Sequence, residues 1–296
     1  MKILCRAPAK INLALHITGQ RNDGYHLLDS LVVFTALGDE LLLSTSDDTL
    51  EDRLELSGLF SDDLSNDGDN LVMRTVSLLR EALASQGIAA PAVHIELQKN
   101  LPVSSGIGGG SADAAATLRG LKQLWNFHLE DTILEVAKRL GADVPMCLQS
   151  SPLRAQGMGD KITLLDGVGG FHLLLVNPGV SIATMDIFNA LSNKNNAGMK
   201  FSHFQNVEML SSTRNDLQEP AISHAPIIQS VLDALAALPQ VQFSRMSGSG
   251  ATCFGVFETV EDAESAQIAL SNQHPEWWVM STTLIDHKEE LDRVIQ

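Results

Sequence analysis

The sequence is poor in aromatic residues and in basic ones. Only 5% of its 296 residues are aromatic, and 20 lysines and arginines stand against 36 acids, so the formal net charge is −16. Nucleic acids and anionic membranes attract basic faces, and neither is therefore an expected partner. The 44% apolar content excludes a disordered chain, and a chain of this length buries a sizeable core and commonly forms two domains.

Cysteine is scarce as well, and long apolar runs are missing. Cys5, Cys147 and Cys253 are odd in number, far apart and set among apolar neighbours, so we expect reduced core thiols without metal-ligand spacing. Charges and a proline within the first ten residues interrupt the apolar run that a signal peptide needs, so we do not expect one. The uncharged stretch 167–185 is broken by four glycines and cannot span a bilayer. We therefore expect a cytoplasmic protein.

The negative charge is concentrated in two segments. Residues 39–69 carry eleven acids and one base, and residues 258–296 carry nine acids and two bases. We interpret both segments as solvated surface. The remainder is close to neutral, so the overall acidity does not exclude a site for a small anionic ligand such as a nucleotide.

Hydrophobic periodicity and turn residues predict a mixture of helices and strands. In the first half the alternation at 11–17 indicates a strand and 19–24 a turn, while Asn70 is placed to cap a helix that runs to about residue 85. Further elements are predicted as a strand at 93–99 and helices at 111–125 and 129–140. In the second half, strands are predicted at 172–176, 241–246, 252–257 and 277–284, with helices at about 184–192, 226–238 and 261–272.

This order of elements favours an α+β fold over a doubly wound parallel sheet. A glycine cluster at 167–170 marks the expected boundary between an N-terminal domain, 1–166, and a C-terminal α+β domain, 167–296. The final strand of the chain could return to the first domain. The sequence leaves the choice between monomer and homodimer open.

The strongest chemical signal is a glycine-rich segment between a predicted strand and a predicted helix. Four glycines in five positions allow positive φ and close approach to a ligand, and the helix that follows offers free N–H groups to a phosphate. The segment is neither a Walker A motif nor G-x-G-x-x-G, and a flexible connection is the alternative interpretation. The residues assigned to nucleotide binding are Pro102, Val103, Ser104, Ser105, Gly106, Ile107, Gly108, Gly109, Gly110, Ser111 and Ala112.

Five segments together resemble the GHMP kinases, and the resemblance extends from residue 7 to about residue 257. Besides the glycine-rich loop, the matching segments are 7–13 (APAKINL), 24–26 (GYH), 141–145 (GADVP) and 247–251 (SGSGA). Isoleucine at 107 and alanine at 112 depart from the usual leucine and serine of the loop motif. The resemblance implies a two-domain kinase with its active site in the cleft between the domains, using ATP and Mg²⁺.

The resemblance implies that Asp143 accepts the proton of the substrate hydroxyl and that Lys10 assists it. A carboxylate is a suitable base for an alcohol, and a neighbouring ammonium would keep it ionised and stabilise the transferring phosphoryl group. Taken singly, Asp143 is typical of a turn residue at a helix end, and Lys10 is typical of a solvated strand residue. Only their occurrence together with the loop favours the catalytic interpretation.

The resemblance also implies a cytidine-diphosphate-linked polyol as the phosphate acceptor, in isoprenoid precursor biosynthesis. Tyr25 and His26 would hold the base, with Phe188 on its other side, because an aromatic ring stacks and a histidine offers a donor and an acceptor. Phe188 alone would read as a core residue of an amphipathic helix. The remaining residues assigned to the substrate are Asn12, Thr184, Gly248, Ser249 and Gly250.

For the nucleotide, the resemblance adds Asn70 and Lys99 as contacts of adenosine, whereas helix capping and surface solvation are their ordinary roles. Ser111 is the one evident hydroxyl for Mg²⁺, and much of its coordination could come from phosphates and water. The segment 215–217 also matches the family, but we assign it no catalytic role, because capping of the next helix explains it.

Two alternatives stay open from the sequence. The first is another kinase of the same family, acting on homoserine or a mevalonate-like alcohol. The second is a nucleotide sensor without turnover, which would need neither Lys10 nor Asp143.

Overall fold

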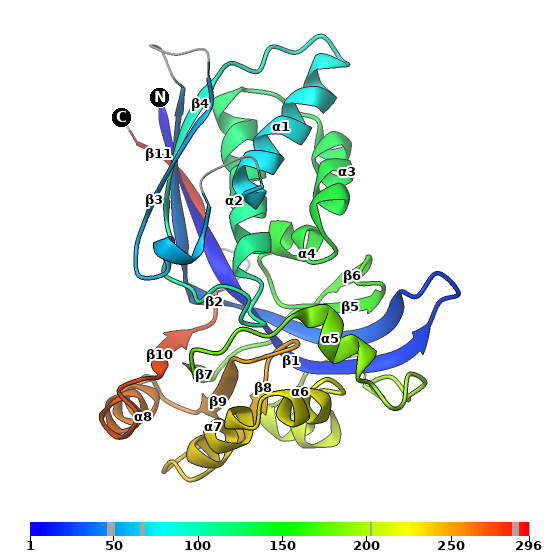
Figure 1. Cartoon of the computed structure of the whole chain (residues 1–296), viewed down its shortest axis with the longest axis vertical. Coiled ribbons are helices and arrows are strands. Elements are labelled where there is room, and N and C mark those ends of the chain that lie inside the picture. The colour runs from blue at the N-terminus through cyan, green and yellow to red at the C-terminus, as the bar shows by residue number, and fades with distance from the viewer. Residues whose placement is uncertain (46–50, 66–68, 202, 286–289, 296) are drawn as a thin grey trace.

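A computed structural model describes residues 1–45, 51–65, 69–201, 203–285 and 290–295, and Figure 1 shows the arrangement of the elements. Its first half contains β1 (Lys2–Gln20), β2 (His26–Thr45), β3 (Arg53–Ser57), the 3-10 turn η1 (Ser61–Asp63), α1 (Leu71–Ala84), β4 (Val93–Gln98), α2 (Gly109–Leu124), α3 (Glu130–Leu140), α4 (Val144–Gln149), β5 (Leu153–Gly157) and β6 (Lys161–Leu164). Its second half contains β7 (His172–Asn177), α5 (Thr184–Asn189), the 3-10 turn η2 (Val207–Ser212), α6 (Gln218–His224), α7 (Ile227–Ala236), β8 (Phe243–Met246), β9 (Cys253–Phe257), α8 (Val260–Gln273), β10 (Trp278–Thr283) and β11 (Asp292–Ile295). The predicted α+β class is confirmed.

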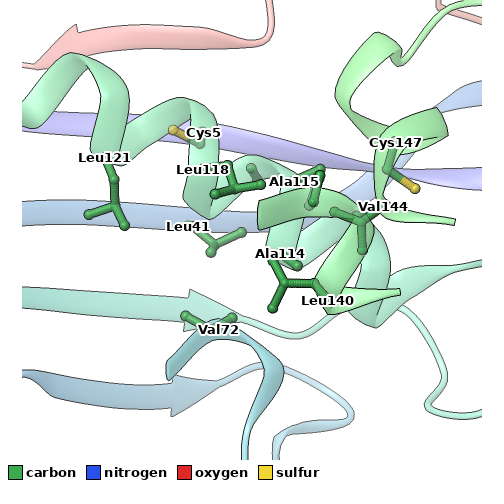
Figure 2. Packing of buried hydrophobic residues seen from close by; sticks show 14 of the residues in the cluster. Cys5, Leu41, Val72, Ala114, Ala115, Leu118, Leu121, Leu140, Val144 and Cys147 are labelled. Carbon is green, nitrogen blue, oxygen red and sulfur yellow. The ribbon is translucent and has the colours of Figure 1, made fainter. Parts of the chain in front are cut away.

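The first sheet has the order β11-β1-β2-β4-β3, with β5 paired to β2 and β6 to β5. Helices α1 to α4 cover one of its faces (Figure 1). Alternate side chains of β1, namely Ile3, Cys5 and Ala7, are fully buried against these helices, as the period of a strand requires. Figure 2 shows part of the resulting core, to which Cys5 and Cys147 contribute as free, buried thiols.

The starts of α1 and α2 lie within two residues of the predicted positions. Asn70 caps α1, because its Oδ1 accepts a hydrogen bond from Val72 N at 2.9 Å. The helix predicted to begin at Ser111 begins two residues earlier, at Gly109. Its small residues let α2 approach the sheet closely, since a Cβ at Gly120 would lie 2.8 Å from Cys5 Sγ.

The second sheet is antiparallel throughout and has the order β10-β7-β9-β8. Its strand β7 was predicted as a buried strand, and both of its faces are covered. Leu174 and Val176 join the core beneath α7, while Leu173 and Leu175 pack with residues of β1. The expected domain boundary at 166/167 falls between β6 and β7 and stays a prediction.

Several elements differ from the predictions. The strand predicted at 11–17 is the middle of the 19-residue β1, and β2, β5, β6 and α4 were not predicted. Residues 29–35 of β2 are buried one after another, so this part lacks the alternation by which a half-buried strand is recognised. Strand β11 returns to the first sheet and pairs with β1.

The interpretation of the acidic segments as solvated surface is wrong at three positions. Asp39 is fully buried, Asp52 forms a two-pronged pair with Arg80, and Asp292 is paired with Arg119. A carboxylate leaves water only where such partners replace its hydration, and sequence composition does not reveal them. Residues 46–50, 66–68, 286–289 and 296 of these segments lie outside the described residues.

Strand β1 also connects the first sheet to the second half through His16, which is 1% exposed. Its Nε2 accepts a hydrogen bond from Arg214 N at 3.1 Å, so the neutral ring carries its proton on Nδ1, 3.1 Å from the Ala197 carbonyl oxygen. Burial, and then the Arg214 guanidinium, lowers the pKa of His16 below 6.5. The folded protein therefore holds this histidine neutral.

We expect this histidine to make the fold less stable in mild acid. Between the lowered pKa and 6.5 the unfolded chain binds a proton that the folded chain does not, so the contribution is complete above pH 6.5 and declines as the pH falls. The slope for one proton is at most about 1.4 kcal/mol per pH unit. Urea unfolding at pH 7.5 and 5.5 of the wild type and His16→Gln measures it. An equal pH dependence in both proteins would contradict the assignment.

Candidate active site

A cavity of about 1080 Å³ lies where β1, the glycine-rich loop, α1, α4, α5 and the loop between β8 and β9 meet. Most of the residues predicted for the site line it. These are Lys10, Asn12, Tyr25, His26, Asn70, Lys99, Pro102, Val103, Ser104, Ser105, Gly106, Gly108, Gly109, Gly110, Ser111, Asp143, Thr184, Phe188, Gly248 and Ser249. Ile107, Ala112 and Gly250 are not part of the lining; the side chains of Ile107 and Ala112 are buried in the core.

The glycine-rich loop has a conformation that requires glycine at two positions. Gly106 has φ +77°, and Gly108, the cap residue of α2, has φ +67°. Gly108 O accepts from Ala112 N at 2.9 Å, so the amides of the first turn, at Gly109, Gly110 and Ser111, have no acceptor within the helix. These N–H groups at the positive end of α2 can bind a phosphate.

The second glycine loop, between β8 and β9, packs backbone to backbone against the first. A Cβ at Gly106 would lie 2.5 Å from Ser247 O, and a Cβ at Gly248 would lie 2.6 Å from Gly106 O. The buried Ser247 hydroxyl donates to Gly106 O and accepts from Asn12 N, both at 3.1 Å. Ser247 thus joins the two loops to β1.

Lys10 and Asp143 meet although 133 positions separate them in the sequence. Lys10 Nζ lies 2.7 Å from Asp143 Oδ2, with the lysine side chain 6% exposed and the aspartate 38% exposed. Gly108 brings the loop onto the lysine stem, because a Cβ there would lie 3.2 Å from Lys10 Cβ. The predicted pair therefore lies beside the loop, with its carboxylate open to the cavity.

His26 and Phe188 form the second end of the cavity. Their ring centroids are 4.9 Å apart at an angle of 40°, and Tyr25 is 64% exposed beside them. His26 Nδ1 is buried without a hydrogen-bond partner among the described residues. Burial, with a smaller effect from Lys194, lowers the pKa of His26, so its neutral ring can offer a ligand one donor and one acceptor.

Asn12 lies in the cavity wall, next to Lys10 on β1. Its Nδ2 donates to Ser30 Oγ at 2.8 Å, whereas its buried Oδ1 has no partner in the described part of the chain. An unpaired buried acceptor is costly unless a ligand satisfies it. The hydroxyls of Thr184 and Ser249 lie 2.9 Å apart across the same cavity.

Lys99 does not have the ordinary role of a lysine, which is a solvated surface charge. It is 2% exposed, and its Nζ lies 2.5 Å from Asp39 Oδ2 and 2.7 Å from Asp113 Oδ2. Burial opposes its charge, but the two carboxylates raise the pKa of Lys99 above its usual value. Burial raises the pKa of Asp113 to about 8 against the lowering effect of Lys99, and Asp39 adds to the rise. The side chains of Asp39 and Asp113 thus hold the Lys99 ammonium. Any contact of Lys99 with adenosine would have to come from its backbone or its aliphatic stem.

Four further residues shape this site: Asp39 and Asp113, which were not predicted, and Ser247 and Asn215, which lie in segments that match the family but were given no role in the site. Asn215 was expected to cap the next helix, but the N-cap of α6 is Leu217, and no side chain caps this helix. Asn215 Oδ1 instead accepts from Leu217 N at 3.0 Å in the preceding turn, and its Nδ2 donates to Met246 O and Gly248 O at 2.8 Å, which holds the second loop. Of the two residues that were not predicted, only Asp113 has a signal in the sequence, because it is a charged residue within the alanine-rich run after the glycines.

The described residues contain no group of three histidines, cysteines or carboxylates that could enclose a metal ion. Ser111, at the start of α2, contributes a partly exposed hydroxyl to the cavity. Such a donor set fits a Mg²⁺ ion that arrives on nucleotide phosphates, because this ion commonly keeps water and phosphate ligands. In the parts of the chain described above, no helix is both long and apolar enough to cross a membrane.

Comparison with known proteins gives two family matches: residues 70–151 match the GHMP kinases N terminal domain, and residues 204–276 match the GHMP kinases C terminal model. The chain is 49% identical over 288 residues to the 4-diphosphocytidyl-2-C-methyl-D-erythritol kinase of Rhizobium meliloti (strain 1021), covering 93% of each chain. It is 45% identical to the kinase of the same name from Chelativorans sp. (strain BNC1), covering 99% of this chain and all of the other.

Solved structures show the same similarity. A crystal structure of 4-(cytidine 5'-diphospho)-2C-methyl-D-erythritol kinase matches with a TM-score of 0.77 and 28% identity, covering 95% of this chain and 98% of the other. The homoserine kinase of Cytophaga hutchinsonii matches with a TM-score of 0.70 at 18% identity, covering 100% of this chain and 97% of the other, a likeness of fold alone.

Proposed function

The chain belongs to the GHMP kinases, and we propose that it acts as a 4-diphosphocytidyl-2-C-methyl-D-erythritol kinase, transferring the γ-phosphoryl group of ATP to the 2-hydroxyl of that substrate. It is an ATP-dependent kinase of isoprenoid precursor biosynthesis, and its products are the 2-phosphate and ADP. The observation that carries the proposal is the contact of Lys10 Nζ with Asp143 Oδ2 between a glycine-rich loop and an aromatic base site in one cavity.

The two ends of the cavity suit the two substrates. The free amides at the start of α2 suit the polyphosphate of ATP. The neutral His26 ring and the faces of Tyr25 and Phe188 suit a cytosine, whose edge offers both donors and acceptors and whose ring stacks. The reacting hydroxyl would then lie between the ends, beside Asp143.

In the transfer step the Asp143 carboxylate takes the proton of the acceptor hydroxyl at Oδ1 or Oδ2 as the oxygen attacks the γ-phosphorus. The Lys10 ammonium, 2.7 Å from that carboxylate, orients it and stabilises charge on the transferring phosphoryl oxygens. Asn12 Oδ1, which has no partner among the residues that the structure describes, accepts from a hydroxyl of the polyol and orients it. ADP leaves with the new negative charge shared among its phosphates.

Magnesium would be held by the ATP phosphates, water and the Ser111 hydroxyl. It supplies charge neutralisation of the phosphates. The three buried thiols are consistent with a reducing compartment, and we place the reaction in the cytoplasm.

A coupled assay of ADP release tests the proposal. We expect turnover with the cytidylated polyol and, with homoserine or mevalonate, no more than the background hydrolysis of ATP. Turnover of either alcohol at a comparable kcat/KM would assign the chain to another activity of the family. ATP binding without turnover on any of the three would favour a nucleotide sensor.

Replacing Phe188 by alanine is expected to raise KM for the cytidylated substrate about tenfold, since stacking on a base contributes about 1–3 kcal/mol. KM for ATP should change less than threefold, because Phe188 lies at the other end of the cavity. Tyr25→Ala should show the same pattern. Steady-state kinetics with each substrate varied in turn measures both constants, and an unchanged KM for the cytidylated substrate would exclude base stacking.

A further inference from the structure

A cluster of three buried ionisable side chains lies behind the glycine-rich loop. The side chains of Asp39, Lys99 and Asp113 are 0%, 2% and 4% exposed, and the ammonium contacts one oxygen of each carboxylate. Buried ion clusters are a poor source of stability, because desolvation offsets much of the attraction between the charges. The position of this cluster indicates instead what it holds in place.

The cluster joins the two stems of the loop. At the entry, Asp39 Oδ1 accepts from Asn100 N at 2.6 Å and from Leu101 N at 2.9 Å. At the exit, Asp113 lies one turn into α2. Between them the lysine supports the helix start, because a Cβ at Gly109 would lie 3.1 Å from Lys99 Nζ.

We propose that Asp39, Lys99 and Asp113 are positioning residues for ATP, which fix both stems of the loop so that its amides are held ready for the polyphosphate. Donors that are already in place need no reorganisation when the ligand binds. This inference rests on the proposed kinase function, because it assumes that the loop binds ATP.

The hydrogen bonds of the two carboxylates differ in a way that makes the inference testable. Asp39 uses both oxygens, one for two amides and the other for the ammonium. Asp113 uses only Oδ2, and its Oδ1 has no hydrogen-bond partner within the described ranges. Asparagine has one acceptor oxygen, so it can replace Asp113 and still accept from Lys99. At position 39 its NH₂ group must face either the ammonium or the two amides.

The experiment makes the same substitution at both positions. Binding of a non-hydrolysable ATP analogue and of cytidine diphosphate is measured by calorimetry, and Tm by thermal unfolding. We expect Asp39→Asn to weaken binding of the ATP analogue tenfold or more, and Asp113→Asn to stay within threefold of wild type. Cytidine diphosphate should bind all three proteins with the same affinity within threefold, because its site lies at the other end of the cavity.

Equal affinities of wild type and Asp39→Asn for the ATP analogue would overturn the inference, and so would equal losses for the two ligands. If Asp39→Asn does not fold, Asp113→Ala is compared with Asp113→Asn. Alanine removes the acceptor of Lys99, so its affinity for the analogue should fall tenfold while asparagine restores it, and equal affinities of these two variants would overturn the inference. If the proposed kinase activity failed but the variants bound the analogue in this order, the positioning role would stand.

Discussion

Asp143→Asn is expected to lower kcat by about 10²–10⁴, the range for loss of a general base. Asparagine has the shape of aspartate and its Oδ1 can accept from Lys10 Nζ, but it cannot take up the hydroxyl proton. Asp143 makes no side-chain cap bond to α4, so helix capping is not lost. KM for both substrates should therefore stay within a few fold of wild type, and Tm should change little.

Steady-state kinetics and thermal unfolding of the purified variant test this expectation. The matched control is Glu135→Gln, which also removes one carboxylate from an ion pair, the exposed pair with Lys138 on α3. Its kcat should equal that of wild type. A kcat within threefold of wild type for Asp143→Asn would show that the phosphoryl transfer needs no base at this position, and positioning by Lys10 and the loop would have to account for the rate.

Local features of the fold could be predicted where a short segment contains its own signal. Asn70 caps α1 as its residue type predicts, and β4 and β7 lie where alternation or a compact apolar run indicated. Strand β2 could not be recognised, because it pairs with β1, β4 and β5 along its length and is buried on both faces for much of it. Its sequence therefore lacks the alternation of a half-buried strand.

The candidate site also has parts that the sequence predicts and parts that it does not. The glycine-rich loop could be recognised from its composition. The pairing of Lys10 with Asp143 was predicted only through the resemblance to a family, because no local pattern relates residues so far apart. The contact of Asp39 with Lys99 depends on the register of β2 and β4, in which Glu40 lies opposite Gln98. One residue beyond that pair, Asp39 inside β2 meets Lys99, which directly follows the last residue of β4. Register between distant segments is a property of the packed fold.

Gly106→Ala is expected to destabilise the protein by about 2–5 kcal/mol and to lower kcat/KM more than tenfold. A left-handed φ costs a residue with a Cβ about 1–2 kcal/mol, and forcing an atom into a packed contact costs about 1–3 kcal/mol more. The new Cβ would lie 2.5 Å from Ser247 O and 2.8 Å from Gly250 N. The two glycine loops must separate to admit it, which moves the loop amides away from the phosphates of ATP.

Gly87→Ala separates the two costs. Gly87 has φ +72°, close to the +77° of Gly106, but a Cβ there meets no atom within 4 Å. Its substitution should therefore cost only the backbone term, about 1–2 kcal/mol, and leave kcat/KM unchanged. Urea unfolding of both variants gives the comparison. If both lost the same free energy of unfolding, the contact between the loops would contribute nothing, and the loss of activity would then have to arise from the loop conformation alone.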